Sequence, residues 1–424
     1  MKGHRLSVVM AHSGIQYSYG RAYALQEEDL LAEFWTTLYD FGYFSRIPFL
    51  KGYATRRRHR ELRPELVHAF IWPELFHRSL MMLLGENHFT RNKVLGIRNR
   101  WFDWHVSKRL KNILHSGFIG FSGGCLRSIK EAKRLGRWAL VDQHDIHPRA
   151  AEHLLREEIE MDPDFSALTT YWPPDRHHLN QALEELEVAD KILVVSTFAL
   201  KTFQFYGVKD EKLVTLPMAF DPPNEVIRSP EKPDKFRILF VGTISQRKGI
   251  RYLLEAVKQL NLSGCELVLL GPIGGDARPL AAYRDFFIHH GFVPSCELEK
   301  YWKTSHLLVL PSLYDGFGQV ILEAMGHGVP VIVSENTAAR DAVRDGTDGF
   351  VVPIRDVKAL KDRILRLYQN LDLWNEMSRN ARIQAQQFTW KKYRERLTKF
   401  LYMTFNRDDL KTHERNLPMS KDLS

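Results

Sequence analysis

The segment LLVLPSLYDGFGQVILEAMGHGVPVIVSE, from Leu307 to Glu335, constrains the fold more than any other part of the chain. Its two short apolar runs, Leu307–Leu310 and Val329–Val333, are typical of buried strands. The residues between them have the composition of an apolar helix, and strands separated by a helix lie parallel in one sheet. Because such sheets are covered by helices on both faces, the segment predicts an α/β fold.

The same alternation extends along the whole chain. Gly249–Leu260 has its apolar residues on one face at helical spacing, which predicts a helix. We expect strands at Leu6–Ala11, Leu66–Phe70, Phe118–Phe121, Trp138–Asp142, Lys191–Ser196, Leu213–Pro217, Arg237–Val241, Cys265–Leu270, Leu307–Leu310, Val329–Val333 and Phe350–Val352. This order predicts two parallel sheets, one in each half, with ligands at the carboxyl ends of their strands.

A chain of 424 residues is too long for a single core. The segment DPPNEVIRSPEKPDK, Asp221–Lys235, is rich in proline and charge, as interdomain linkers are. We therefore expect an N-terminal domain at residues 1–221, a linker at 222–236, a C-terminal domain at 237–405 and a flexible tail at 406–424. Two such domains would enclose a cleft.

The composition indicates the compartment. An apolar content of 44% and a charged content of 26% fit a globular protein. No apolar run approaches the roughly 18 residues that span a bilayer, and Leu6–Ala11 is too short for a signal sequence. Cys125, Cys265 and Cys296 are scattered and odd in number, which argues against a disulfide framework. We therefore expect a cytoplasmic protein.

The net charge of +9 is concentrated in one segment. Residues 51–111 hold 14 lysines and arginines against five acids, a surplus equal to the charge of the whole chain. Basic residues with interleaved tryptophans, as in Arg56–Arg60 and Trp101–Lys111, suit an anionic membrane surface or an anionic acceptor. A solvated basic face without a specific role is the alternative. No nucleic-acid-binding signature accompanies the charge, so we expect no nucleic-acid partner.

Glycines and two carboxylates follow the strand expected at Leu307–Leu310. The connection between this strand and the next helix contains Gly316, Phe317 and Gly318. Glycines let backbone N–H groups approach a ligand closely. The amino end of a helix favours phosphate. Glu323 projects from the apolar helix and needs hydrogen-bond donors, which a ribose could supply. A structural salt bridge is the alternative for Glu323. Asp315 stands directly before the glycines.

The segment FVGTISQRKGI, Phe240–Ile250, again joins a strand to a helix through a glycine turn, here at Gly242 and Thr243. Arg247 and Lys248 stand just before the helix begins, where two cations could neutralise a diphosphate. A solvated turn with two basic residues is the ordinary explanation. The pairing of this turn with Asp315 and Glu323 favours a binding site.

From Arg237 to Leu397 the sequence resembles the donor-binding domain of the retaining GT-B glycosyltransferases of group 1, family 4. Its members carry a pattern like E-G-F-G-x-x-x-x-E-A-M-x-x-G-x-P-V-I, which stands here as Asp315-GFGQVIL-Glu323-AMGHGVPVI. VGTISQRKG, LVLLG, LLVLPS and DGTDGFVVP occur in the family order. The first half resembles the family more weakly, chiefly in EVADKILVVSTFALKTFQFYGV and KLVTLPMAFD. The resemblance implies two Rossmann-like domains facing a central cleft, with the last helix crossing back to the N-terminal domain.

The resemblance also implies roles for single residues. Glu323 would hold the ribose of a nucleotide sugar, and Asp315 would bind hydroxyls of the donor sugar, helped by the amides of Phe317 and Gly318. Lys248 would stabilise the departing diphosphate.

Two further roles fall in the first half. Gly14, after the first strand, would approach the phosphates from the other domain. A histidine in VDQHDIHPR would touch the transferred sugar, and both His144 and His147 are candidates, either of which could also be a plain loop residue.

Three positions depart from the family pattern. Asp315 replaces the usual glutamate, which shortens its reach. Thr243 stands where many members have a diphosphate-binding arginine, and Arg247 beside Lys248 would take over that charge. Met218 and Ala219 stand where many relatives have Asn-Gly.

The expected reaction is transfer of a sugar from a nucleotide diphosphate to an acceptor hydroxyl. The resemblance implies a hexosyltransferase that retains the anomeric configuration, needs no metal or other cofactor, and acts on a glycan or lipid-linked acceptor, as in polysaccharide assembly. The triplet DPD at residues 162–164 is similar to the metal site of another glycosyltransferase fold, but we expect coincidence. The alternatives are a GT-B phosphorylase or epimerase, and a non-catalytic scaffold that binds nucleotide sugars or anionic lipid.

Overall fold

The computed structural model describes residues 6–14, 17–43, 46, 57–84, 88–169, 176–225 and 235–405. The described residues fall into two compact units. The first unit is drawn from Met1–Gln143, Asp175–Leu193 and Arg394–Ser424, and the second from His144–Pro174 and Val194–Tyr393. The domain boundaries expected from the sequence, and the cleft between the domains, stay predictions; the tail at 406–424 lies outside the described residues.

The N-terminal half builds a seven-stranded sheet in the order β3-β2-β1-β4-β5-β6-β7. β1 pairs with β2 and β4 in parallel, and so do β2 with β3 and β4 with β5. The strands are β1 (Val8–His12), β2 (Leu31–Thr36), β3 (Val67–Ala69), β4 (Gly117–Phe121), β5 (Trp138–Gln143), β6 (Lys191–Val194) and β7 (Leu213–Thr215). Every residue of β1 and β4 is buried, as expected for central strands covered on both faces.

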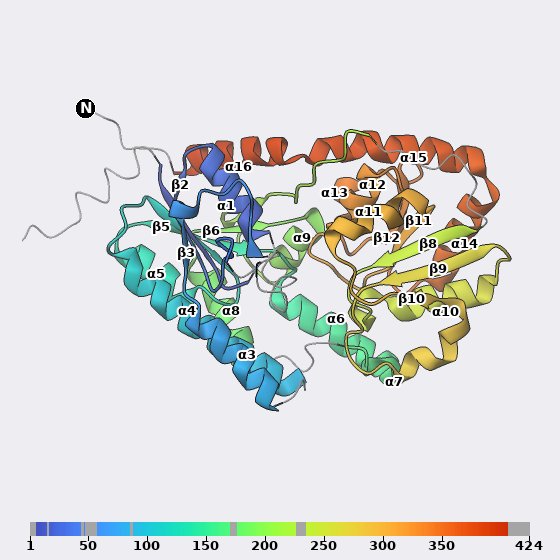
Figure 1. Ribbon diagram of the computed structural model, residues 1–424, viewed down its shortest axis with the longest axis horizontal. Coiled ribbons are helices and arrows are strands. Elements are labelled where there is room, and N and C mark those ends of the chain that lie inside the picture. Colours follow the sequence, from blue (N-terminus) through green and yellow to red (C-terminus); the bar gives the residue numbers. More distant parts are fainter. Residues whose placement is uncertain are drawn as a thin grey trace, which may run out of the picture. The chain divides into compact units, whose positions relative to one another are not determined.

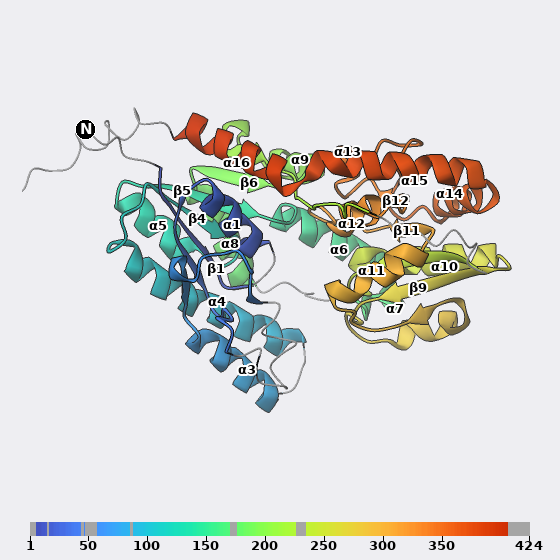
Figure 2. The same cartoon turned by 45° about the horizontal axis from the view of Figure 1, so that its top comes forward.

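Helices connect these strands (Figure 1). They are α1 (Ser18–Glu27), α3 (Trp72–Leu84), α4 (His88–Leu110), α5 (Leu126–Arg134), α6 (Pro148–Met161), α7 (Pro163–Ser166), α8 (Arg176–Val188) and α9 (Thr197–Phe205). α3 and α4 lie side by side in both views of the molecule (Figures 1 and 2).

The C-terminal half builds a six-stranded parallel sheet in the order β10-β9-β8-β11-β12-β13. Its strands are β8 (Phe236–Val241), β9 (Cys265–Leu270), β10 (Ile288–His289), β11 (Leu307–Leu310), β12 (Val331–Ser334) and β13 (Gly349–Val352). Its helices are α10 (Ile250–Leu260), α11 (Ser295–Thr304), α12 (Val320–Gly326), α13 (Ala339–Ala342), α14 (Val357–Gln369), α15 (Leu371–Ala385) and α16 (Trp390–Thr404). α10 packs against α14, and α12 packs against α15.

The two parallel sheets with helical connections confirm the α/β fold predicted from the sequence, and a strand occurs at each expected position. β2 and β10 were not foreseen. Glu33 interrupts the apolar run of β2, and its carboxylate accepts a hydrogen bond from Trp35 Nε1 at 2.8 Å and lies 3.5 Å from His68 Nε2. These local partners let a charged residue occupy a strand, which the apolar pattern alone does not reveal.

Gly249 provides a test of how tightly the second sheet is packed. It has a φ of 70°, and a methyl group on its Cα would lie 1.9 Å from the carbonyl oxygen of Pro311. We expect Gly249→Ala to lower the free energy of unfolding by more than about 2 kcal/mol, because a backbone clash adds to the left-handed strain. Urea unfolding measures this loss.

Gly346→Ala is the matched control. Gly346 has a φ of 76°, but an added methyl group would meet no heavy atom within 4 Å. The free energy of unfolding of this variant should fall by only about 1 kcal/mol. Equal losses in the two variants would contradict the close approach of Gly249 to Pro311.

Candidate functional site

The loops that follow β8 and β11 meet at the carboxyl edge of the second sheet. The two strands are neighbours, with Leu307 beside Ile238, and the strand order reverses between them. Ligands of open α/β sheets bind at such a reversal, because the connections leave it in opposite directions. The loop after β8 carries Lys248, and the loop after β11 carries Asp315. These loops are therefore the candidate functional site.

Lys248 and Asp315 form an ion pair in this site. The backbone N–H of Leu313 donates to the carbonyl oxygen of Arg247 at 2.9 Å, so the two loops are also joined by their main chains. The Arg247 guanidinium lies 5.3 Å from the centre of the Tyr314 ring. The structure thus brings Asp315 next to Arg247 and Lys248, although 67 residues separate Lys248 from Asp315 in the sequence.

Lys248 is held in an environment that disfavours a lone charge. Burial, and next the nearby charge of Arg247, lower the pKa of Lys248 well below its usual value, whereas Asp145 acts in the opposite direction. The ion pair with Asp315 also favours the ammonium form. Lys248 is therefore influenced by the charges of Arg247, Asp145 and Asp315, and an anionic ligand could replace Asp315 as its partner.

The glycines of the second loop are required by close packing. A methyl group on Gly316 would lie 2.1 Å from the carbonyl oxygen of His144. The hydroxyl of Ser196 donates to the carbonyl oxygen of Gly316 at 2.5 Å. Gly318 has a φ of 78°, and the Phe317 ring between them is buried. The loop is held from both sides, so the direction of its amide groups is fixed.

Glu323 differs from the other charged residues of the site. It is half-buried on α12, and its carboxylate has no hydrogen bond or ion pair to the described part of the chain. Burial raises its pKa to about 7. The structural salt bridge considered as an alternative is therefore not found among the described residues. A carboxylate without partners costs stability, which favours a binding role.

The structure separates the roles of the two candidate histidines. His147 is 4% exposed, caps the start of α6 by accepting a hydrogen bond from the Arg149 N–H at 3.2 Å, and stacks on Tyr206. Burial, and next Arg149, lower the pKa of His147 to about 4. His144 is half-buried, and its backbone lies against Gly316. His147 therefore has a structural role, and His144 adjoins the candidate site.

The remaining predicted site residues lie in two places. Gly242 and Thr243 follow β8, and Gly242 has a φ of 141°. A methyl group on Gly271 would lie 2.0 Å from the carbonyl oxygen of Gly242, so this turn is closely packed. Gly14 follows β1 in the first unit, and its approach to phosphates stays a prediction. Asp145, next to His144, was not foreseen, because nothing in the sequence indicates its proximity to Lys248.

Part of the predicted basic face is buried. Arg57 and Arg98 lie 3.3 Å and 3.2 Å from the carboxylate of Glu74, and all three are buried. These two arginines therefore neutralise a buried acid and are not part of the basic face expected for an anionic partner. Arg56 lies outside the described residues. Arg58 and Arg60 are exposed, as are Lys108, Arg109 and Lys111.

No helix among the described residues is long and apolar enough to cross a bilayer. The described part of the chain also holds no group of three or more His, Cys, Asp or Glu side chains that could bind a metal ion together. Asp162 of the DPD triplet caps α7 and pairs with Arg251 at 2.5 Å, which is a structural role. Cys125 and Cys265 are free thiols. The expectation of metal-free chemistry stays a prediction.

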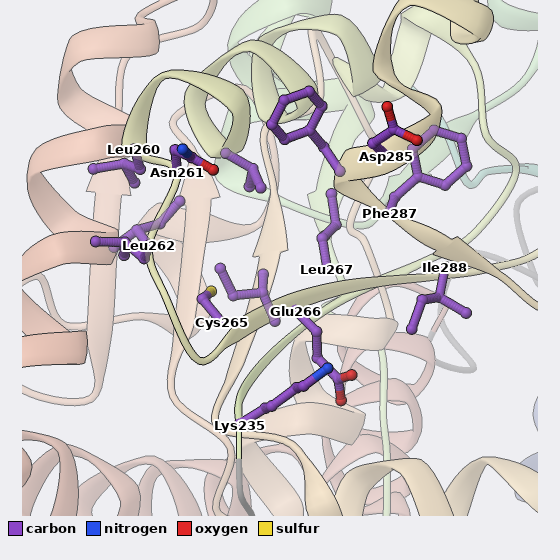
Figure 3. Close-up of a pocket in the computed structure, with 14 residues that line it drawn as sticks. Lys235, Leu260, Asn261, Leu262, Cys265, Glu266, Leu267, Asp285, Phe287 and Ile288 are labelled. Carbon is purple, nitrogen blue, oxygen red and sulfur yellow. The ribbon is translucent and has the colours of Figure 1, made fainter.

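A pocket of about 500 Å³ lies away from these loops, at the opposite edge of the second sheet (Figure 3). Lys235, Cys265 and Glu266 line it where β8 and β9 begin, and Ile288 lines it from β10. Its lining brings together none of the predicted site residues. The glycine-rich edge at the strand reversal remains the better candidate.

The sequence is similar to those of known glycosyltransferases. The family described as glycosyl transferases group 1 matches residues 235–370. The O-antigen chain mannosyltransferase B of Escherichia coli is 31% identical over 282 residues, which are 60% of this chain and 73% of that protein. The α-D-kanosaminyltransferase of Streptomyces kanamyceticus is 32% identical over 160 residues, 35% of this chain and 40% of that protein.

Solved structures match almost the whole chain. Sucrose-phosphate synthase from Thermosynechococcus elongatus has a TM-score of 0.64 at 18% identity and covers 95% of this chain and 99% of its own. Anabaena HepE in complex with UDP and glucose has a TM-score of 0.62 at 14% identity and covers 94% of this chain and 100% of its own. At these identities the likeness shows the fold alone, which is GT-B.

The pKa of Glu323 gives a pH-dependent prediction. An acid whose pKa is higher in the folded than in the unfolded protein destabilises the fold as pH rises between the two values. Here those values are 4.5 and about 7. Relative to Glu323→Gln, the free energy of unfolding of the wild type should fall by up to about 3 kcal/mol between about pH 4 and pH 8. The partial exposure of Glu323 makes this value an upper limit.

Urea unfolding of the wild type and of Glu323→Gln at matched pH measures this difference. The two proteins should have similar free energies of unfolding near pH 4, where the wild-type carboxyl is neutral. The variant should be the more stable of the two near pH 8. A difference that does not change with pH would show that Glu323 is not titrating as described.

Proposed function

The chain belongs to the glycosyl transferases of group 1, and we propose that it transfers a hexose from a nucleotide-diphosphate sugar to an acceptor hydroxyl. The observation that carries this proposal is the site at the strand reversal. There Lys248, which follows Arg247, pairs with Asp315, and Glu323, on the helix after the glycine loop, presents a carboxylate without protein partners in the described chain. Paired cations suit a diphosphate, and an unpaired carboxylate suits ribose hydroxyls.

Donor binding would exchange partners within the site. The diphosphate would take the place of Asp315 beside Lys248, and the freed carboxylate would accept hydrogen bonds from hydroxyls of the donor sugar. The amides of Phe317 and Gly318, held by the packing of Gly316, would also face the ligand. Glu323 would bind the ribose, and Gly242, Thr243 and, from the first unit, Gly14 would let the phosphates approach the backbone.

The chemical step breaks the bond between the anomeric carbon and the phosphate oxygen and forms a bond from that carbon to the acceptor oxygen. We propose that the configuration is retained, with the acceptor attacking from the side that the phosphate leaves. The departing phosphate then accepts the acceptor proton, so no protein base and no metal is required. Lys248 and Arg247 stabilise the charge that develops on the diphosphate.

His144 is the histidine that we place beside the transferred sugar. Its backbone adjoins Gly316, whereas the ring of His147 caps α6 and stacks on Tyr206. An imidazole at this point would accept a hydrogen bond from a sugar hydroxyl or donate one to it.

The acceptor is proposed to be a glycan or a lipid-linked glycan in polysaccharide assembly, and the protein is proposed to act in the cytoplasm. The similarity to an O-antigen chain mannosyltransferase supports this choice. It also makes a mannose donor the first one to test.

The proposal predicts which ligands stabilise the protein. At least one of GDP-mannose, UDP-glucose, UDP-galactose and ADP-glucose should raise the melting temperature, since a ligand of the folded state stabilises it by mass action. Lys248→Ala and Glu323→Ala should each reduce turnover by about 100-fold or more while the protein stays folded. His147→Ala should act through stability, and His144→Ala through turnover. Melting curves and product analysis measure these effects.

Other outcomes would identify other functions. Unchanged turnover in both Lys248→Ala and Glu323→Ala would remove the assignment. Release of a nucleotide diphosphate without a new glycoside would indicate an epimerase or phosphorylase. Tight nucleotide binding without turnover on any acceptor would indicate a scaffold.

We also propose that α3 and α4 rest on an anionic membrane surface. Both helices expose large apolar side chains, each at least 36% exposed, at Trp72, Leu75, Phe76, Met82, Leu83, Ile97, Trp101 and Trp104. On α3 these residues share one helical face, and the Phe76 and Trp101 rings lie 6.2 Å apart between the helices.

The charges around this face favour anionic lipid over a neutral partner. Exposed cations occur at Arg58, Arg60, Arg78, Lys93, Lys108, Arg109 and Lys111. The only acids of α3 and α4 are Glu74 and Asp103, and both are buried. An apolar face surrounded by cations is the surface that binds at the headgroup boundary of an anionic bilayer.

Co-sedimentation with vesicles tests this proposal. Met82→Ser combined with Leu83→Ser should reduce the partition onto vesicles rich in phosphatidylglycerol by about 10-fold or more, because two side chains lose their apolar burial. These residues are 87% and 81% exposed, so the fold should tolerate the change. Phe205→Ser is the control, since Phe205 is 82% exposed but lies in the second unit. No binding of the wild type at low salt would remove the proposal.

A further inference from the structure

Within the second unit, a buried carboxylate anchors α6 to the parts of the chain that follow β8 and β13. Glu158, on the last turns of α6, is only 1% exposed. Its carboxylate accepts hydrogen bonds from the Tyr252 hydroxyl at 2.6 Å, from Arg355 Nε at 2.7 Å, and from Gln246 Nε2. A buried carboxylate with three donors is a strong structural anchor, because each donor offsets part of its lost hydration.

One of these partners belongs to the cationic turn. Gln246 begins the short 3-10 turn Gln246–Lys248, so it directly precedes Arg247 and Lys248. Its backbone N–H donates to the carbonyl oxygen of Leu168 at 3.1 Å, and its side chain is fully buried. The segment that follows β5 therefore holds this turn through both its main chain and its side chain.

The same segment also contacts the glycine loop. The carbonyl oxygen of His144, a few residues before α6, is the group that a methyl on Gly316 would meet at 2.1 Å. Residues 144–169 thus touch both loops of the candidate site. They lie far from those loops in sequence and outside the region that matches the family model.

A turn of three residues has little stability of its own. Its contacts with the loop after β11 hold it from one side. Without the anchor at Gln246, Arg247 and Lys248 would be less restricted in direction, and binding a diphosphate would first require their ordering. We propose that Glu158 is a positioning residue, which through Gln246 fixes the turn so that Lys248 points at the diphosphate of the donor. This inference rests on the proposed function, since it assumes that the turn binds phosphate.

Calorimetric titration with UDP, GDP and ADP tests the inference. With the diphosphate that binds the wild type most tightly, Glu158→Gln should raise the Kd by about 10- to 100-fold, because a displacement near 1 Å suffices for such a loss. Glu157→Gln is the matched control. Glu157, which precedes Glu158, also pairs with Arg355, at 2.8 Å, whereas Gln246 donates its side-chain hydrogen bond to Glu158.

A double-mutant cycle separates positioning from general loss of structure. In a Lys248→Ala background, Glu158→Gln should change the Kd by less than about 2-fold, because there is no lysine left to position. A merely structural role would cost the same in both backgrounds. If Glu158→Gln fails to fold, Gln246→Met serves instead, since it removes the link and leaves Glu158 paired with Tyr252 and Arg355.

The outcomes distinguish this inference from the proposed function. A wild type that binds none of the three diphosphates would overturn both. A wild type that binds one of them, with Glu158→Gln and Gln246→Met binding it equally well, would overturn the positioning role alone. Weaker binding in these two variants but not in Glu157→Gln supports it.

Discussion

The pairing of β8 with β11 is the constraint on which the candidate site depends. These strands belong to separate strand-helix units, and their parallel register brings the turn before α10 against the loop after β11. The contact is close enough that Gly249 meets the carbonyl oxygen of Pro311 without room for a side chain. The ion pair of Lys248 with Asp315 follows from this adjacency. The glycines therefore serve the packing of two loops as well as any ligand.

The charges of the site are arranged in two different ways. Lys248 and Asp315 satisfy each other, so the protein can keep both half-buried without a ligand. Glu323 has no such partner in the described chain, and burial alone sets its raised pKa. Stability would favour an apolar residue at this position of α12, whose neighbours are apolar. A carboxylate in this position is best explained by a ligand that donates hydrogen bonds to it.

The sequence predicts the elements of this site better than their mutual contacts. β11 begins and ends where its apolar run does, because this central parallel strand is buried on both faces. The choice between His144 and His147 could not be made, because it depends on a helix cap and on the ring of Tyr206, far along the chain. The burial of part of the basic segment could not be predicted either, because it depends on one acid of α3, Glu74, which pairs with two buried arginines.

α6 shows why a family resemblance finds the cationic turn but not what holds it. The matching region begins at residue 235, whereas Glu158 lies in the first half of the sequence. Its partners Gln246, Tyr252 and Arg355 all lie within that region, so the pattern contains one side of the contact only. A glutamate on an amphipathic helix normally faces solvent. Its burial becomes apparent only when the helix is seen to pack on the second unit, which makes the turn and its anchor parts of one compact body.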